Sequence, residues 1–462
     1  MLRNVIYEGR KLNLAGPRKV GHESNTYTII IGKNGTGKSR LLSAIVSEML
    51  YRLIPNERQL SLTSPIQDIS FDRVPIPGKI IAVSTSPFDK FPLQRNRNPI
   101  PNYTYLGLRE LSTNNFGLGY LSKIIGSLIE VIIHQPAQLE GILEVLRYLD
   151  YTDHIQIQLQ VRASESLVKD MLSTKQFLAH LERFPKGPKI PFSAFNWEQF
   201  RNEDGTISKR KVDQLAKIVK RNLEHIKDFR SLKTLSISRN GIMISERNLF
   251  SEQKDPNFLA DLPFLLQVGL VRLRKVILSK RSSRETFSIS DASSGEQSVL
   301  MNILGIASQI SNNSLICIDE PEVCLHPEWQ ERYIKLLVST FQKYVGCHFL
   351  IATHSPQIVS NLDAKNSFIL SMETGKTIEA KTIIGHSSDF QLANVFDSPG
   401  FKNEYLARIA ISVFTKVTKN KTFDSSDKQY FDILAKNSKF LEASDPVLDL
   451  YSAINEMHKL YG

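Results

Sequence analysis

The sequence contains little cysteine and no long apolar run. With three cysteines, Cys317, Cys324 and Cys347, among 462 residues, a scaffold held together by disulfides is excluded, and a reducing cytoplasm is the expected compartment. No apolar stretch approaches the roughly 20 residues that a membrane-spanning helix needs, so we expect no membrane partner. The first ten residues show no apolar segment followed by a small-residue cleavage site, which argues against secretion.

The overall composition is that of a folded protein with a basic surface. Apolar residues make up 41% and charged residues 23%, which excludes wholesale disorder. A chain of this length holds about two or three domains. Lys and Arg outnumber Asp and Glu by 58 to 47, for a net charge of +11. This excess suits a polyanionic partner such as nucleic acid or a nucleotide, but it is equally compatible with a basic protein that binds neither.

Changes in pattern along the chain predict four segments. Residues 1–119 and 271–388 contain β-rich runs and form the expected core, whereas 120–270 form an expected insertion that is mostly helical and 389–462 a C-terminal helical region. Within the insertion, helical spacing covers 121–149, 164–181 and 209–226, and a proline-rich stretch interrupts it at 184–191. Residues 232–244 around Asn240-Gly241 predict a hairpin, because this dipeptide suits a type I′ turn.

A glycine-rich loop near the N-terminus predicts a phosphate-binding site. Residues 32–39, GKNGTGKS, fit the pattern G-x-x-x-x-G-K-[ST] between a β-branched run and a stretch with helical spacing, which is the context that this motif requires. The glycines let backbone N–H groups surround phosphate oxygens, Lys38 reaches the β/γ-phosphates, and the Ser39 hydroxyl binds Mg²⁺. The expected nucleotide contacts are Gly32, Lys33, Asn34, Gly35, Thr36, Gly37, Lys38, Ser39 and Arg40.

Two carboxylates follow a buried strand later in the chain. The run Leu-Ile-Cys-Ile at 315–318 ends in Asp319 and Glu320, and an open α/β sheet places its ligand chemistry where strands end in this way. We expect Asp319 to hold Mg²⁺ and Glu320 to orient and polarise the attacking water. The simpler alternative is an acidic cap at the start of a helix, which is less favoured beside a phosphate-binding loop.

A small hydroxyl-rich loop precedes another apolar helix. Residues 291–297, DASSGEQ, could bind an anion through the N–H groups at the helix N-terminus. Spacing alone favours the simpler interpretation, a serine N-cap with a nearby acid.

Together these motifs resemble the ABC-type ATPase superfamily. Residues 32–39 resemble its Walker A motif, 293–297 its signature, and 316–320 its Walker B motif with a catalytic Glu320; residues 325–327 match the D-loop, and His354 matches the switch histidine. All five motifs occur in the expected order, which reverses the preference for a mere N-cap. The resemblance implies that ATP and Mg²⁺ are the cofactors and that Ser293, Ser294, Gly295, Glu296 and Gln297 contact the nucleotide of a second protomer.

Two positions depart from the family's pattern. The signature reads Gly-Glu at 295–296 where the family has Gly-Gly. No glutamine stands at the expected Q-loop, where Ser-Pro-Phe-Asp at 86–89 follows a strand. The group that senses Mg²⁺ at this place is therefore unassigned, and Asp89 is not chosen for it.

Several strings resemble the soluble OLD-, RecF- and SMC-like branch of this superfamily. They are Asp-Glu-Pro-Glu at 319–322, Thr-His-Ser-Pro at 353–356, and the runs at 83–92 and 105–109. The last two runs look most similar to antiphage-defence ATPase subunits of the Septu and retron-associated PtuA-like group. The resemblance covers about 1–110 and 271–375 and implies an α/β ABC-type head, a mixed sheet with flanking helices. It also implies an ATP-sandwich dimer, compatible with a higher oligomer, that controls a separate nuclease or toxin.

Two other functions remain as alternatives. One is a RecF- or SMC-like DNA-binding ATPase of repair or replication, and the other is a nucleotide-sensing scaffold with negligible turnover. DNA or RNA contacts would fall on two basic clusters, although a solvated surface is the simpler interpretation. The clusters are Lys209, Arg210, Lys211, Lys217, Lys220 and Arg221, and then Arg272, Arg274, Lys275, Lys280, Arg281 and Arg284. No nuclease motif is visible, and the cysteine and histidine spacings fit no standard zinc site.

Overall fold

The protein is described by a computed structural model. It describes residues 1–16, 24–53, 65–71, 77–93, 102–109, 116–136, 138–161, 165–183, 200–202, 204–226, 232–246, 255–362, 365–383 and 385–462. The proline-rich stretch 184–191 lies outside these residues. Two compact units are present. The first comprises Met1–Pro77, Ile318–Val338 and Tyr344–Gly462, and the second comprises Gly78–Cys317 and Ser339–Lys343.

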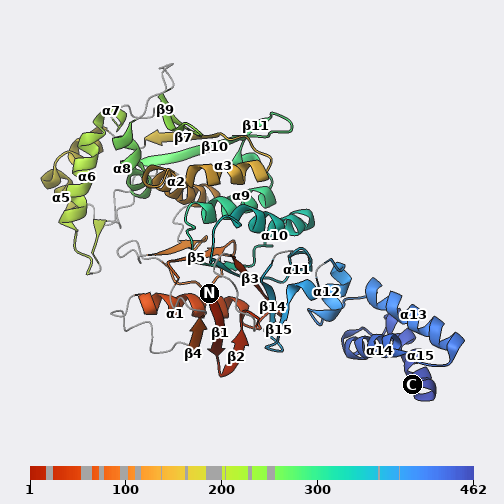
Figure 1. The fold of residues 1–462 in the computed structure, drawn as a ribbon. Coiled ribbons are helices and arrows are strands. Elements are labelled where there is room, and N and C mark those ends of the chain that lie inside the picture. Colours follow the sequence, from red (N-terminus) through yellow and green to blue (C-terminus); the bar gives the residue numbers. More distant parts are fainter. Residues whose placement is uncertain are drawn as a thin grey trace. The chain divides into compact units, whose positions relative to one another are not determined.

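The first unit is built on parallel strands around β3 (Thr26–Ile31). Strands β13 (His348–Ala352) and β14 (Ser367–Ser371) pair with β3 in parallel on its two sides, and β15 (Thr377–Glu379) pairs antiparallel with β14 (Figure 1). Every residue of β3 is buried, which is why its sequence is a continuous run rather than an alternation. A second, antiparallel sheet has the order β2-β1-β4, from β1 (Leu2–Tyr7), β2 (Arg10–Asn13) and β4 (Ile66–Phe71).

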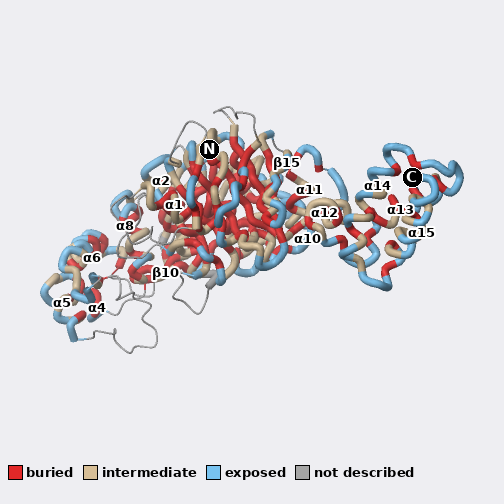
Figure 2. The backbone as a smooth tube through the Cα atoms, turned by 90° about the horizontal axis from the view of Figure 1, so that it is seen from below, coloured by how far each residue is buried: buried red, intermediate tan, exposed pale blue. Residues whose placement is uncertain are grey.

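Helices complete the first unit. Helix α1 (Lys38–Leu53) packs on β13 through a buried stripe with helical spacing, Leu42, Ile45, Val46 and Met49. The other helices, in chain order, are α10 (Pro327–Phe341), which ends in the second unit, α11 (Pro356–Ser360), η4 (Ala380–Thr382), α12 (Ser388–Asn394), α13 (Glu404–Asn420), α14 (Ser425–Asn437), η5 (Ser438–Phe440) and α15 (Pro446–Tyr461). Helices α13 to α15 share a small core, whose buried inner sides are visible in Figure 2. The helical C-terminal region expected from the sequence is therefore present.

An antiparallel sheet runs through the second unit, in the order β11-β10-β7-β8-β9. Its strands are β7 (Ile155–Val161), β8 (Leu232–Ser238), β9 (Gly241–Glu246), β10 (Val271–Ser279) and β11 (Thr286–Ser288). In β7, every second residue from Ile155 is buried, and Gln156, Gln158 and Gln160 lie between them, half-buried. This alternation is the period of a half-buried strand, but the sequence analysis predicted no strand at 155–161. The hairpin expected around Asn240-Gly241 is present as β8 and β9.

Helices account for most of the remaining chain of the second unit. They are α2 (Phe116–His134), α3 (Gln138–Tyr148), α4 (Glu165–Met171), α5 (Thr174–Arg183), α6 (Lys209–Arg221), α7 (Leu223–Ile226), α8 (Pro256–Gln267), η3 (Ile289–Asp291) and α9 (Ser294–Ala307). Helices α2 and α8 pack against β10, and α9 packs against α2 and α3. The expected boundary at residues 270–271 falls just before β10, which pairs with β7. The four-segment division stays a prediction.

Three parallel-sheet strands complete the second unit. They have the order β12-β5-β6, from β5 (Lys79–Ser84), β6 (Tyr103–Leu106) and β12 (Ser314–Asp319). The last two residues of β12 belong to the first unit, where the next residue, Glu320, donates its N–H to the carbonyl of Ala352 at 2.9 Å. The carboxylates that end β12 therefore lie at the end of β13.

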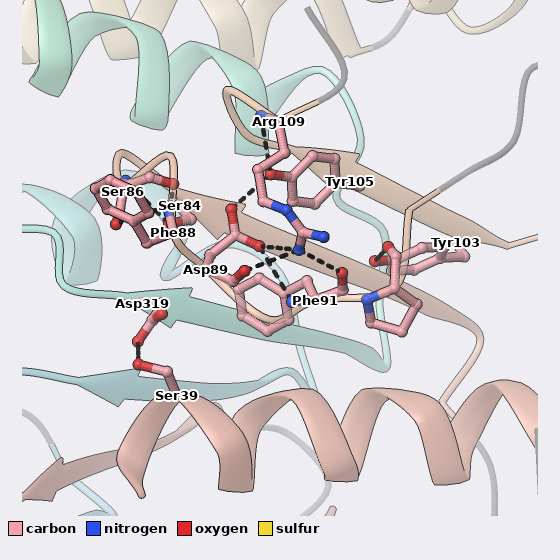
Figure 3. Close-up of polar contacts among 11 residues, drawn as sticks. Ser39, Ser84, Ser86, Phe88, Asp89, Phe91, Tyr103, Tyr105, Arg109 and Asp319 are labelled. Atoms are coloured by element: carbon pink, nitrogen blue, oxygen red, sulfur yellow. Dashed lines mark hydrogen bonds and ion pairs between the residues drawn. The ribbon is translucent and has the colours of Figure 1, made fainter. Parts of the chain in front are cut away.

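Asp89 anchors the loop that follows β5. Its carboxylate is buried and accepts hydrogen bonds from the Tyr105 hydroxyl at 2.6 Å and from the Phe91 N–H at 3.1 Å (Figure 3). The Arg109 guanidinium lies 3.2 Å from the same carboxylate and also donates to the carbonyls of Asp89 and Phe91. Burial and the bond to Asp89 raise the pKa of Tyr105, so the phenol keeps its proton. Asp89 is a structural anchor of this loop.

We expect Tyr105→Phe to lower the stability of the second unit by about 2 kcal/mol, because it removes one donor from a buried carboxylate. The midpoint of thermal unfolding, followed by circular dichroism, measures the change. Ser86→Ala is the matched control, since its hydroxyl accepts the Phe88 N–H at the exposed side of the same loop, and it should change stability by less than about 0.5 kcal/mol. Equal midpoints for Tyr105→Phe and Ser86→Ala would contradict the anchoring role.

Candidate active site

The glycine-rich loop between β3 and α1 has a backbone that its glycines alone permit. Gly35 and Gly37 have φ angles of 83° and 92°, in the left-handed region that disfavours other residues. A Cβ on Gly32 would lie 2.6 Å from the Thr36 hydroxyl. Because the first N–H groups of a helix have no partner within it, the start of α1 presents donors to this loop. The loop is therefore shaped to hold an anion.

The Lys38 ammonium lies at the centre of the site. The residue is 4% exposed, and its Nζ donates to the Gly32 carbonyl at 2.9 Å. Nζ also lies 2.5 Å from His354 Nε2, so Lys38 and His354 are in contact. Burial lowers the pKa of Lys38, and the neighbouring carboxylates, first among them Glu320, oppose this shift. A buried cation with surrounding carbonyl acceptors is the group that can transfer its hydrogen bonds to phosphate oxygens.

Ser39 and Asp319 form the oxygen pair that the sequence predicts for Mg²⁺. Ser39 Oγ at the start of α1 donates to Asp319 Oδ1 at the end of β12, at 2.9 Å (Figure 3). Mg²⁺ prefers oxygen ligands and usually takes only one or two from the protein, with the remainder from phosphates and water. The pair therefore fits the ion, and it joins two segments that are 280 residues apart in the chain.

Glu320 is held beside His354 by an unusual backbone. Its φ angle is 48°, which is uncommon for a residue with a side chain. Glu320 Oε1 lies 3.3 Å from His354 Nε2. Burial lowers the pKa of His354, and the charge of Lys38 lowers it further, so the imidazole is neutral near neutral pH. The acid and the histidine that the sequence selects for catalysis are therefore adjacent.

Two further acids contact the site, and the sequence analysis assigned neither to it. Glu322 Oε1 accepts the His354 N–H, whereas its Oε2 is buried without a hydrogen-bond partner among the described residues. Burial raises the pKa of Glu322. Glu373, in the turn after β14, accepts the Lys33 N–H at 3.1 Å. Glu322 is the second acid of Asp-Glu-Pro-Glu, which was a usable signal, whereas nothing in the sequence near Glu373 indicates its position.

The remaining loop residues lie at the surface. The side chains of Lys33, Asn34 and Arg40 are exposed, and Lys33 Nζ lies 4.7 Å from the centre of the Phe440 ring in η5. No pattern in the sequence indicates a contact between the C-terminal region and this loop.

The signature residues belong to the second unit. Ser293 caps α9, accepting the Glu296 N–H at 3.2 Å, and both Ser293 and Ser294 are exposed. Gln297 instead donates to the carbonyls of Ser290 and Ala292, at 3.2 and 2.9 Å, which holds the loop before the helix. The serines are therefore placed to meet a ligand, whereas the amide of Gln297 supports the loop.

Asp89 is not a candidate for contact with a metal ion. All of its carboxylate is buried, and it is occupied by Tyr105, Arg109 and the Phe91 N–H. The Q-loop role that the sequence left unassigned does not fall on this residue. Among the helices that the structure describes, none is both long and apolar enough to cross a membrane.

The sequence has matches among known proteins. Residues 175–360 match the family model described as "AAA domain, putative AbiEii toxin, Type IV TA system". The chain is 30% identical to the Retron Ec83 probable ATPase of Escherichia coli over 124 residues, which cover 24% of this chain and 22% of that protein. It is 23% identical to the Retron Vc95 probable ATPase of Vibrio cholerae serotype O1 biovar El Tor over 405 residues, 80% of this chain and 73% of that protein.

Solved structures of Smc heads match much more weakly. One, bound to the C-winged helix domain of ScpA, gives a TM-score of 0.26 at 9% identity, over 82% of this chain and 96% of that chain. A second, from Pyrococcus furiosus, gives 0.30 at 12% identity, over 82% and 97%. These scores are too low to carry an argument. The sequence matches support an ATPase, and the chain is similar to the probable ATPases of two retrons.

Proposed function

We propose that this chain binds ATP with Mg²⁺ and hydrolyses it as the ATPase subunit of an antiphage defence complex, in which nucleotide-dependent dimerisation controls a partner nuclease or toxin. The observation that carries the ATPase part is the convergence of Lys38, Asp319, Glu320 and His354 within one unit. The defence context rests on the named retron relatives.

Each residue has a distinct task in this proposal. Lys38 and the first N–H groups of α1 hold the phosphates, and Ser39 and Asp319 hold Mg²⁺. The ion, when bound, neutralises the charge that develops on the phosphate oxygens. Glu320 orients the attacking water and accepts its proton, and the neutral His354 beside it donates or accepts a hydrogen bond at the same place.

The signature loop acts on the nucleotide of a second copy. Its exposed serines stand at the N-terminus of a 14-residue helix, where N–H groups and the helix dipole favour a phosphate. Nucleotide bound between two copies would close the dimer, and hydrolysis would open it. The domain division, the companion subunit and the role of each named residue belong to this proposal.

A DNA-binding ATPase is the second candidate, and one observation favours it. On β10, Arg274 and Lys275 are both exposed, and the strand pairs with β7, which carries three half-buried glutamines. Two adjacent cations beside a polar sheet face suit a phosphate backbone. Stimulation of ATP turnover by DNA in the isolated chain would favour this candidate over control of a companion nuclease or toxin.

Glu320→Gln should bind ATP but hydrolyse it at least about a hundredfold more slowly, because the water loses its base while the metal pair is intact. It should also accumulate a closed dimer with ATP. Turnover assays and light scattering measure the two effects. Lys38→Ala is the control, since it should lose ATP binding itself in a calorimetric titration. Wild-type turnover and assembly in Glu320→Gln would show that this carboxylate has another task.

Ser294→Arg should keep the ATP affinity of the single chain but lose hydrolysis, because the bulky cation blocks the signature from the partner's nucleotide. Mixing it with Lys38→Ala protein should restore part of the turnover. Neither variant alone builds a complete site, but the mixed dimer has one site from an intact Lys38 and an intact Ser294. If the mixture recovers no activity, the shared-site mechanism is wrong.

We expect the chain to co-purify with a separate nuclease or toxin, docked on 120–270 or on the helices after 389. Co-expression with the product of a neighbouring gene, followed by affinity purification, measures this.

Binding of nucleic acid to the complex should weaken steeply with salt, because Lys and Arg contacts release counterions. Arg274→Ala should flatten this dependence, and Lys335→Ala on α10 is a control at another exposed cation. Purification of the chain alone with nuclease activity of its own would contradict the division of labour.

A further inference from the structure

Glu296 occupies a place where the family signature has glycine, and its side chain is turned inward. The side chain is only 15% exposed. The Tyr151 hydroxyl donates a hydrogen bond to Glu296 Oε1, and Lys280 Nζ lies 3.5 Å from the same oxygen. The first turn of α9 is thus tied to two residues from elsewhere in the second unit, one following α3 and one following β10.

These two partners are themselves held firmly. The Tyr151 residue is 1% exposed, and its ring centre lies 5.8 Å from that of Phe287, over which Lys280 Nζ also lies at 5.7 Å. The backbone around Tyr151 is bonded to the backbone around Lys280. The Thr152 N–H donates to the Ser279 carbonyl at 2.9 Å, and the Arg281 N–H donates to the Asp150 carbonyl at 2.8 Å. Tyr151, Lys280 and Phe287, called the Tyr151 corner below, are therefore tied to the end of β10.

If Glu296 served only to cap α9, its carboxylate would contact the backbone at the start of the helix. The sequence Ser293-x-x-Glu296 suits a capping box, in which the acid bonds back to the N–H of the capping residue. In helix α14, Asp424 and Asp427 make both bonds of such a box. In α9, the Ser293 hydroxyl accepts the Glu296 N–H, but the structure shows no bond from the Ser293 N–H back to Glu296 among the described residues. The Glu296 carboxylate is instead directed to the Tyr151 corner. Burial and the bond to Glu296 raise the pKa of Tyr151, so the phenol remains a donor.

We propose that Glu296 is a positioning residue, which fixes the first turn of α9 and the exposed hydroxyls of Ser293 and Ser294 to the Tyr151 corner of the five-stranded sheet. This inference rests on the proposed role of the signature loop in hydrolysis. Its consequence is that the sheet containing β7 and β10 sets the position of the signature. A glycine at 296 would leave the turn without this connection.

The test uses the full-length chain and separates turnover from binding. Tyr151→Phe and Glu296→Ala should each lower kcat about tenfold, equivalent to about 1.4 kcal/mol in the barrier, while the ATP affinity of the single chain stays unchanged. Their combination should lower kcat no further, because both remove the same contact. Glu296→Gln keeps an acceptor for Tyr151 and loses only the charge opposite Lys280, so its kcat should lie between those of Glu296→Ala and the wild type.

Mixing supplies a readout that a purely structural role would not change. Lys38→Ala protein is inactive alone but has an intact signature, so adding it to Tyr151→Phe protein should raise turnover. Tyr120→Phe is the matched control. Its hydroxyl is also buried in the second unit but donates to the Leu106 carbonyl, and its loss should leave kcat unchanged.

Three outcomes would overturn the inference. The first is a wild-type kcat in both single variants, and the second is a double variant in which the two losses of kcat multiply. The third is a fall in both ATP affinity and kcat, with no recovery of turnover on mixing with Lys38→Ala protein. Ser294→Arg separates this failure from a failure of the proposed function. If Ser294→Arg is inactive while Tyr151→Phe and Glu296→Ala are normal, only the positioning role is wrong. If Ser294→Arg hydrolyses ATP normally, the signature role itself is wrong.

Discussion

The burial of the Lys38 ammonium is the constraint on which the rest of the site depends. A cation that is 4% exposed is stable only with compensating partners, because removing it from water is costly. The loop carbonyl of Gly32 supplies a hydrogen bond, and the carboxylates that end β12 supply charge. The Gly32 carbonyl and the end of β12 lie beside this group, and its charge adds to burial in lowering the pKa of His354. The same partners then define where phosphate and metal can bind.

The sequence could predict the local part of this arrangement. The loop depends on glycines and a lysine within eight residues, and its strand and helix flank it directly. The contact between Ser39 and Asp319 spans 280 residues, but it was predictable because Ser39 follows the loop after β3 and Asp319 ends β12, and both strands belong to the parallel sheet. The order of the motifs also indicated the signature loop, for which spacing alone favoured a simple cap.

Contacts that arise from tertiary packing could not be predicted from the sequence. Asp89 stands at the expected Q-loop position, yet its neighbours Tyr105 and Arg109 bury it, and only the folded chain shows this. Glu373 meets the phosphate-binding loop because β14 lies beside β3, a pairing that no local pattern encodes. The strand β7 is a different case, since its alternation of glutamine with aliphatic residues was visible in the sequence. The residues on both sides, 121–149 and 164–181, have helical spacing, which favoured a helical interpretation of the whole stretch.

The backbone at Glu320 has a consequence for how this chain can change. Left-handed conformations cost non-glycine residues free energy, so the fold holds an acid where it would more readily hold glycine or asparagine. Substitutions that relax this strain would make the protein more stable while removing the carboxylate. Under the proposed role of Glu320 as the base, selection for stability and selection for catalysis act in opposite directions at this position. A more stable descendant without this carboxylate is one substitution away.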